Sequence, residues 1–198
     1  MPHLVNVNTA LISVHDKTGV KYLYSELLKV NPDIRVISSG GTYAELANVN
    51  GKNLVQVSDY TGFPEMPSGL VKTLHPKVHG GILGNEGEAE FMRQHGIEKI
   101  DLVVVNLYPF KGEGKFHEAR KNIDIGGVSL IEAGCKNFTR VAVLTDPSEY
   151  ERFVSLLTEN KGTDLKTRLN LAQRAAGRLS RYLKAISEYF EGLREGDI

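Results

Sequence analysis

Short apolar runs alternate along this chain with segments in which apolar residues recur every three or four positions. The runs cover residues 10–14, 34–38, 54–57, 102–105 and 140–144. Each run has the length of a β-strand, and the segments between them include the spacing of amphipathic helices. Strands that alternate with helices are typical of βαβ units and of a parallel sheet covered on both faces. We therefore predict an α/β fold around a central, mainly parallel sheet.

The periodic segments predict helices over residues 20–30 and 43–49, and an exposed helix over residues 86–96. Near the C-terminus, residues 164–193 have an apolar repeat that predicts one long amphipathic helix or two consecutive ones.

Two segments lack a clean repeat. Residues 58–81 are rich in proline and glycine, and we predict an ordered excursion across the carboxyl edge of the sheet. Long irregular segments in compact domains are often functional. Residues 111–121 are predicted to form a solvated, mobile connection.

Composition narrows the class of protein. With 198 residues, the chain is long enough for one well-buried domain, predicted to span residues 1–198. The 24 basic and 24 acidic side chains cancel, so the basic excess of most nucleic-acid-binding proteins is missing. A single cysteine, Cys135, rules out an internal disulfide framework. Because no apolar stretch resembles a signal core or a membrane span, we expect a soluble cytoplasmic protein.

Two loops at predicted strand ends are candidates for binding an anion. Ser39, Gly40, Gly41 and Thr42 follow one strand and precede a helix, so backbone N–H groups, hydroxyls and the helix dipole can all face a phosphate. A plain glycine-rich turn with a threonine cap has the same sequence. The loop after the first strand carries Lys17 near the same sheet edge, and ligands collect outside the carboxyl ends of parallel strands.

A second group of residues has the chemistry of proton transfer. Lys72, Tyr108, Asp124 and Lys136 each lie in or beside a loop at a predicted strand or helix end. A single lysine is usually a solvated surface charge. Two lysines that face one pocket would lower each other's pKa, and an aspartate between them would orient an amine. The N–H groups of the Gly126–Gly127 pair could hold a developing oxyanion.

Other reactive residues have simpler interpretations. His75 and His79 have the spacing of two metal ligands on a helix, but Pro76 interrupts that geometry and no third strong ligand is near. We therefore expect structural or substrate-contacting histidines and no metal. We interpret Cys135 as a small buried hydrophobic residue.

Several short sequence motifs, taken in order along the chain, resemble those of a known family. They are SVHDKTG at 13–19, SGGT at 39–42, TGFPEM at 61–66, VKTLHPKVHGGIL at 71–83, NLYPF at 106–110, IDIGG at 123–127 and KN at 136–137. Nearly the whole chain resembles the inosine monophosphate (IMP) cyclohydrolase domain, usually the N-terminal half of a bifunctional purine-biosynthesis enzyme. The chain is similar either to a stand-alone cyclohydrolase or to an excised domain.

The resemblance implies a methylglyoxal-synthase-like three-layer fold with C-terminal helices. It implies closure of 5-formamidoimidazole-4-carboxamide ribotide to IMP with loss of water, the last step of de novo purine biosynthesis. Lys136 would be the principal proton acceptor and donor, held by Asp124, while Lys72 and Tyr108 assist at the formyl oxygen. The implied substrate-binding residues are Ser13, His15, Asp16, Lys17, Ser39, Gly40, Gly41, Thr42, Thr73, Val105, Asn106, Ile125 and Gly126.

The resemblance also implies partners. These are the purine ribotide and IMP, a second copy in a homodimer and a separate aminoimidazole-carboxamide ribotide (AICAR) transformylase. No cofactor, metal, nucleic acid or membrane is implied.

Two positions depart from the family pattern. The family usually has serine at His15 and arginine at Leu70. A histidine can donate a hydrogen bond to a phosphate and would make binding depend on pH near neutrality. A leucine cannot replace a guanidinium, so we expect weaker substrate binding at that corner.

Two other activities fit the same fold. A regulatory module that binds a phosphorylated ligand would need the two loops but not the four proton-transfer residues. A methylglyoxal synthase would act on a smaller phosphate ester. The KTLHP and Tyr-Pro motifs favour the cyclohydrolase over this alternative.

Overall fold

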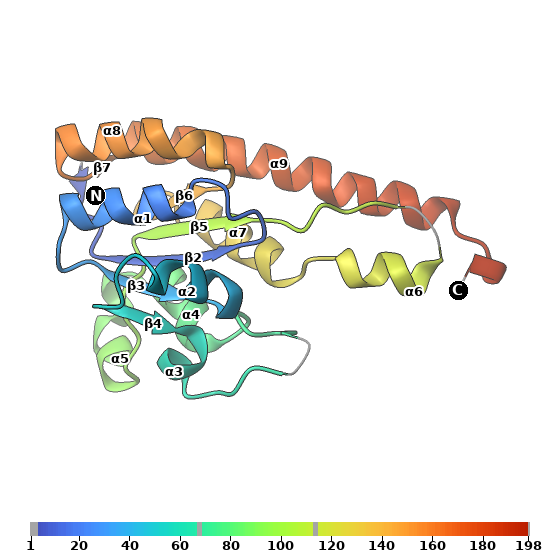
Figure 1. Cartoon of the computed structure of the whole chain (residues 1–198), viewed down its shortest axis with the longest axis horizontal. Helices are drawn as coiled ribbons and strands as arrows, with labels where there is room; N and C mark the ends of the chain where they lie inside the picture. Colours follow the sequence, from blue (N-terminus) through green and yellow to red (C-terminus); the bar gives the residue numbers. More distant parts are fainter. Residues whose placement is uncertain (1–3, 67–68, 113–114, 198) are drawn as a thin grey trace.

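The computed structural model describes residues 4–66, 69–112 and 115–197. Its centre is a five-stranded, fully parallel sheet with strand order β4-β3-β2-β5-β6 (Figure 1). The strands are β2 (Thr9–Val14), β3 (Arg35–Ser38), β4 (Leu54–Gln56), β5 (Leu102–Asn106) and β6 (Ala142–Leu144). The predicted α/β fold and all five predicted strands are confirmed, with ends shifted by at most two residues.

Helices cover both faces of this sheet, as predicted. One face is covered by α1 (Val20–Val30), α2 (Gly40–Ala47) and α8 (Tyr150–Asn160). The other face is covered by α3 (Val57–Thr61), α4 (Pro76–Leu83), α7 (Gly126–Lys136) and the first half of α9 (Leu165–Gly192). A separate pair of short antiparallel strands, β1 (Leu4–Val5) and β7 (Thr163–Asp164), lies beside the start of α9.

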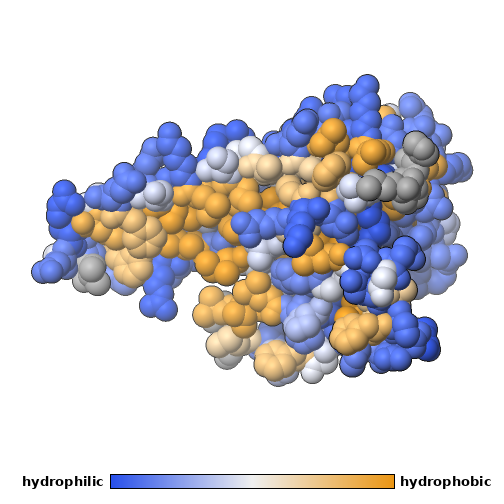
Figure 2. Space-filling view, turned by 180° about the vertical axis from the view of Figure 1, so that it is seen from behind, coloured by the Kyte–Doolittle hydropathy of each residue, from blue (hydrophilic) through white to orange (hydrophobic). Residues whose placement is uncertain are grey.

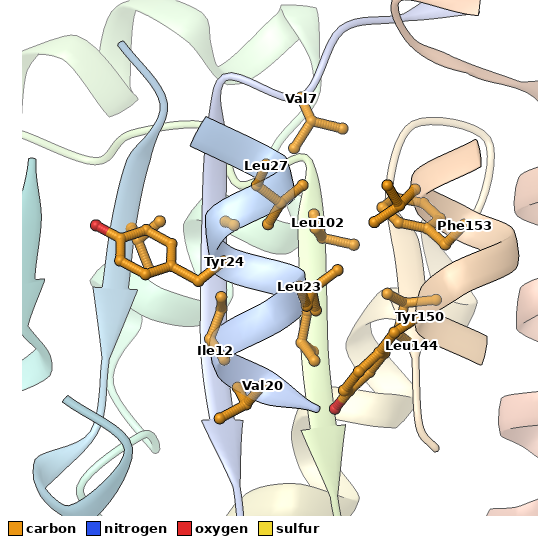
Figure 3. Close-up of a cluster of buried hydrophobic side chains, with 14 of the residues drawn as sticks. Val7, Ile12, Val20, Leu23, Tyr24, Leu27, Leu102, Leu144, Tyr150 and Phe153 are labelled. Atoms are coloured by element: carbon orange, nitrogen blue, oxygen red, sulfur yellow. The ribbon is translucent and has the colours of Figure 1, made fainter. Parts of the chain in front are cut away.

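Alternation along the strands divides the core into two layers. Ile12 of β2 and Leu102 of β5 belong to the layer under α1 and α8, whereas Leu11 and Val103 belong to the opposite layer. Figure 3 shows side chains of α1 pointing onto β2 and β5, with Tyr150 and Phe153 of α8 closing the side. Because both faces are buried, the central residues of the strands are apolar, as is typical of a parallel sheet.

Several predicted segments differ from the structure at their ends. The helix predicted over residues 43–49 begins three residues earlier, at Gly40. The segment 58–81 is irregular only between α3 and α4. The connection 111–121 contains a short helix, α6 (Phe116–Ala119). Residues 67–68 and 113–114 of these segments lie outside the described residues.

The C-terminal repeat forms one helix. The 28-residue helix α9 packs on α7 and β6 through Ala175 and Leu179, and its second half continues past the sheet as an arm (Figure 1). Phe110 and α6 pack against this arm through ring contacts with Tyr189 and Phe190. None of the helices among residues 4–66, 69–112 and 115–197 combines the length and the hydropathy of a membrane span.

Short 3-10 turns complete the described elements. They cover Glu86–Glu88, Arg120–Asn122, Pro147–Glu149 and Glu195–Asp197, and the first of them leads into α5 (Ala89–Gln94). The exposed helix predicted over residues 86–96 is therefore a 3-10 turn followed by a short α-helix.

A glycine sets how closely α7 approaches the sheet, and this can be tested. A Cβ atom at Gly134 would overlap the Val143 side chain of β6, whereas a Cβ at Gly177 in α9 would meet only Arg181 Nη1, at 3.6 Å. We expect Gly134→Ala to lower the free energy of unfolding by about 1–3 kcal/mol through overpacking. Gly177→Ala should raise it by up to about 1 kcal/mol through helix propensity. Urea unfolding of both variants checks this, and equal effects would contradict the close packing of α7.

Candidate active site

A cavity of about 240 Å³ opens at the carboxyl ends of β2, β3 and β5. The chain leaves β2 toward one side of the sheet and β5 toward the other, so a crevice forms between them. Of the seventeen residues predicted for the site, fourteen line this cavity. They are Ser13, His15, Lys17, Ser39, Gly41, Thr42, Lys72, Thr73, Val105, Asn106, Tyr108, Asp124, Ile125 and Gly126.

Hydroxyl and ammonium groups gather at the β2 and β3 end of the cavity. Ser13 Oγ and Ser39 Oγ lie 2.8 Å apart, across the ends of the two strands. Lys17 Nζ donates to the carbonyl oxygens of Val14 and His15, which holds the ammonium group at the cavity wall. Gly41 lies in the first turn of α2, where N–H groups lack helical partners. These groups together suit a phosphate.

The Asn106 side chain holds the loop after β2 in place. Its Oδ1 accepts hydrogen bonds from the N–H groups of His15 and Asp16, at 2.7 and 2.8 Å. Its Nδ2 donates to the Asp16 carbonyl at 2.9 Å. Asn106 is one of the implied substrate-binding residues, and the structure adds that its side chain shapes the neighbouring loop.

Two residues of the predicted phosphate group have other contacts. Thr42 Oγ1 bonds to both the N–H and the carbonyl of Val14, so it fastens α2 to the end of β2. Gly40 is not on the cavity wall. A Cβ atom there would lie 3.5 Å from Glu65 Oε2, because the Glu65 carboxylate lies against the first turn of α2. A carboxylate is stabilised at this end of a helix.

Asp16 does not contribute to the cavity either. Its carboxylate accepts a hydrogen bond from Thr18 N at 2.9 Å, and hydrogen bonds to Thr18 lower the pKa of this exposed group. Asp16 therefore shapes the turn before α1, and its implied role in substrate binding stays a prediction.

Asp124 lies directly before α7, and the two glycines that begin this helix allow neighbouring side chains to pack closely against it. Asp124 Oδ1 accepts from Gly127 N at 2.7 Å, and Oδ2 accepts from Tyr108 N at 3.4 Å. A Cβ at Gly127 would lie 2.7 Å from Asp124 Oδ2, and a Cβ at Gly126 would lie 2.7 Å from Thr73 Oγ1. Of the N–H pair predicted for an oxyanion, Gly127 N is thus occupied by Asp124.

Lys72 is carried by a strained loop. Val71, directly before it, has φ of 55°, a conformation that is rare for a β-branched residue. Such strain is often found at functional sites. Burial, and then the positive charge of nearby Lys72, lower the pKa of Lys17. The two lysines expected to face one pocket are Lys72 and Lys136, but the cavity wall carries Lys72 with Lys17 instead.

Tyr108 lies against the histidine that replaces the family's serine. The rings of His15 and Tyr108 have centroids 4.3 Å apart and planes inclined by 43°. The loop after β2 therefore touches the loop after β5 through side chains as well as through Asn106. Leu70, the other departure, lies on the cavity wall with 58% of its surface exposed.

Lys136 is not near the other three predicted proton-transfer residues. It is the last residue of α7, whose first residue is Gly126. At 1.5 Å per residue, ten steps along the helix amount to about 15 Å. The helix must carry the chain back to the start of β6, so Lys136 lies at the opposite edge of the sheet from the cavity. Within one chain, Lys136 is therefore remote from this cavity, and its implied role in proton transfer stays a prediction.

Two further residues at the site, Lys121 and Tyr182, are not predicted from the sequence. Lys121 lines the cavity, which gives it three lysines against one aspartate. Tyr182 of α9 contacts the loop that carries Asp124. Neither residue lies in a recognisable sequence motif, and only the packing of α9 brings Tyr182 near Asp124.

The remaining reactive residues have structural contacts. His75 Nδ1 accepts from Lys77 N at 3.1 Å and caps α4. Burial raises the pKa of the Cys135 thiol, which donates to the Ala172 carbonyl. Among the described residues, no three His, Cys, Asp or Glu side chains are placed to hold a metal ion.

Comparison with protein families finds two matching models. The model described as MGS-like domain matches residues 22–129, more than half of the chain. The model described as AICARFT/IMPCHase bienzyme matches residues 134–197.

Two curated relatives are similar over nearly the whole chain. The bifunctional purine biosynthesis protein PurH of Rhizobium etli (strain CIAT 652) is 44% identical over 197 residues, which cover 96% of this chain and 36% of that protein. PurH of Bradyrhizobium diazoefficiens is 45% identical, covering 98% of this chain and 38% of that protein. The chain thus spans little more than a third of these curated relatives.

A solved structure has a similar fold. The crystal structure of ForH superposes with a TM-score of 0.82 at 31% identity. The match covers 94% of this chain and 99% of that chain, so the two have nearly the same extent.

The lowered pKa of Lys17 predicts how anion binding depends on pH. As pH rises from about 7 to about 10, Lys17 should lose its proton earlier than an ordinary lysine, and the attraction for a phosphate dianion should fall with it. In Lys17→Arg the guanidinium stays charged, so the decrease should be smaller. Calorimetric titration with IMP measures both. The same pH dependence in the two proteins would contradict a role for Lys17.

Proposed function

The chain belongs to the MGS-like domain family, and from this premise we propose that it is an IMP cyclohydrolase. The proposed reaction closes 5-formamidoimidazole-4-carboxamide ribotide to IMP with loss of water. The observation that carries the proposal is one cavity whose wall holds hydroxyls and Lys17 together with Lys72, Tyr108 and Asp124. The likeness to PurH and the matching bienzyme model support it.

The two groups of residues on the cavity wall suit the two ends of the substrate. We place the 5′-phosphate near Ser13, Ser39, Lys17 and the first turn of α2, where positive charge and N–H groups gather. The base then lies toward Val105, Thr73 and the start of α7. There the two glycines keep the wall free of side chains.

Ring closure requires three changes at the base. The carboxamide nitrogen attacks the formyl carbon, and the π electrons of that carbonyl move onto its oxygen. The carboxamide nitrogen and the formamido nitrogen each lose one proton, and the oxygen gains two and leaves as water. A C=N bond to the former formamido nitrogen then remains in the new ring, and the former carboxamide nitrogen keeps one proton. Each step is a proton transfer or a bond change within the substrate, so the proposal includes no cofactor.

We assign these proton transfers to groups on the cavity wall. The carboxamide N–H becomes acidic as the new C–N bond forms, so the Asp124 carboxylate can accept its proton. Lys72 and Tyr108 face the same cavity and can donate to the formyl oxygen as negative charge builds. With three lysines and one aspartate on the cavity wall, the positive charge stabilises the negative charge that builds on the formyl oxygen. Lys136 of the same chain has no part in these steps.

The partners of the chain are part of the proposal. The purine ribotide and IMP are its small-molecule ligands, and the reaction supports a cytoplasmic location. Because the PurH relatives are bifunctional proteins nearly three times as long, a separate AICAR transformylase is a second proposed partner.

We also propose a homodimer. Leu183 and Phe190, on the half of α9 that extends past the sheet, are 43% and 49% exposed, and Figure 2 shows hydrophobic surface along this arm. An exposed apolar face of this kind favours association with a second copy.

The reaction itself is the first test. Purified protein should form IMP from the formamido ribotide faster than the spontaneous rate, with a chelator present, as followed by ultraviolet absorbance. Asp124→Asn keeps an acceptor for Gly127 N but removes the charge, and kcat should fall at least about a hundredfold. Asp59→Asn alters an exposed carboxylate outside the cavity and serves as the control. Binding of IMP without ring closure would leave the chain a nucleotide-binding module instead.

The oligomeric state is the second test. Light scattering should give twice the 21.9 kDa of one chain, because the apolar arm would be covered by a second copy. Leu183→Glu should shift the mass to that of one chain, while Leu83→Glu, an exposed leucine at the end of α4, should not. A wild-type protein of one-chain mass would refute the homodimer.

A further inference from the structure

The hydroxyl of Tyr182 connects α9 to the loop that carries Asp124. Asp124 N donates to Tyr182 Oη at 2.7 Å, and Tyr182 Oη donates to the Asn122 carbonyl at 3.0 Å. One hydroxyl therefore bonds to both sides of the bend from residue 122 to residue 124. Burial raises the pKa of Tyr182, so this hydroxyl keeps its proton at neutral pH and can continue to donate.

These bonds complete the support of Asp124. Its two carboxylate oxygens accept from Gly127 N and Tyr108 N, which orients the side chain relative to α7 and to the loop after β5. Its backbone is held by Tyr182. Loss of the Tyr182 hydroxyl would leave the Asp124 N–H and the Asn122 carbonyl without these partners, and the loop would then be free to move.

Tyr182 also contacts the loop that carries Tyr108. The Phe110 ring meets the Tyr182 ring edge-on, with centroids 6.4 Å apart and planes at 77°. Phe110 is only two residues beyond Tyr108. A single side chain of α9 therefore supports both loops that supply the proposed proton-transfer groups, although it lies 58 residues from Asp124 in the sequence.

We propose that Tyr182 is a positioning residue of the reaction, which holds Asp124 and Tyr108 in place without touching the substrate. This inference rests on the proposed function. Tyr182 lies outside the cavity wall, and the phosphate end of the cavity is formed by other elements. Its loss should therefore affect the chemical step more than the binding of ligand.

The test replaces Tyr182 with phenylalanine, which keeps the ring and removes only the hydroxyl. A displacement of about 1 Å in a catalytic group can cost a hundredfold in rate, so kcat of Tyr182→Phe should fall about tenfold to a hundredfold. The Kd of IMP, measured by calorimetry, should change less than about threefold because Lys17, Ser13 and Ser39 are undisturbed. Tyr22→Phe, on the exposed surface of α1, is the matched control and should change neither value.

Hydrogen exchange supplies a readout that does not depend on the reaction. The backbone amides of peptides covering residues 120–126 should exchange faster in Tyr182→Phe than in the wild type. In Tyr22→Phe their exchange rate should equal that of the wild type. Unchanged exchange, or faster exchange with wild-type kcat, would overturn the positioning role. A wild type without turnover would refute the proposed function, and faster exchange in Tyr182→Phe would then still show that Tyr182 holds this loop.

Discussion

The hydrogen bonds of the Asn106 side chain are the interaction on which the site depends. They fasten the backbone at His15 and Asp16 to the end of β5. β2 and β5 are neighbouring parallel strands, with Val14 in register with Asn106, so two loops that lead to opposite faces of the sheet start side by side. Without a fixed distance between these loops, Lys17 and His15 on one side would not face Tyr108 on the other.

Helix direction then decides which residues reach the cavity. In a parallel sheet, each connecting helix starts at the carboxyl edge and returns to the opposite edge. The first turns of α2 and α7 therefore lie at the cavity, with glycines that permit a close approach and N–H groups that favour negative charge. The last turn of α7, with Lys136, lies far from it. The direction of the helices therefore explains both why the proposed phosphate site lies at the cavity and why Lys136 lies far from it.

The sequence was a good guide to the framework, since five apolar runs became the five strands and residues 20–30 became α1. The sequence was less reliable where backbone geometry determines where a helix begins or what a side chain contacts. The two glycines at the start of α2 weaken the helical pattern there, because glycine has low helix propensity, yet the helix begins at Gly40. Thr42 was predicted to face a ligand, but its hydroxyl is bonded to Val14. Tyr182 could not be identified, because only tertiary packing brings α9 to the Asp124 loop.

A crystal structure of the protein with bound IMP would test the central claim most directly, that one chain supplies a complete ring-closing site at the carboxyl ends of β2, β3 and β5. The account predicts the 5′-phosphate within hydrogen-bond distance of Ser13, Lys17 or Ser39. It predicts the base beside Lys72, Tyr108 and Asp124, with Lys136 of the same chain remote from the ligand. IMP bound at another face, or held in this cavity with Asp124 turned away from the base, would contradict it.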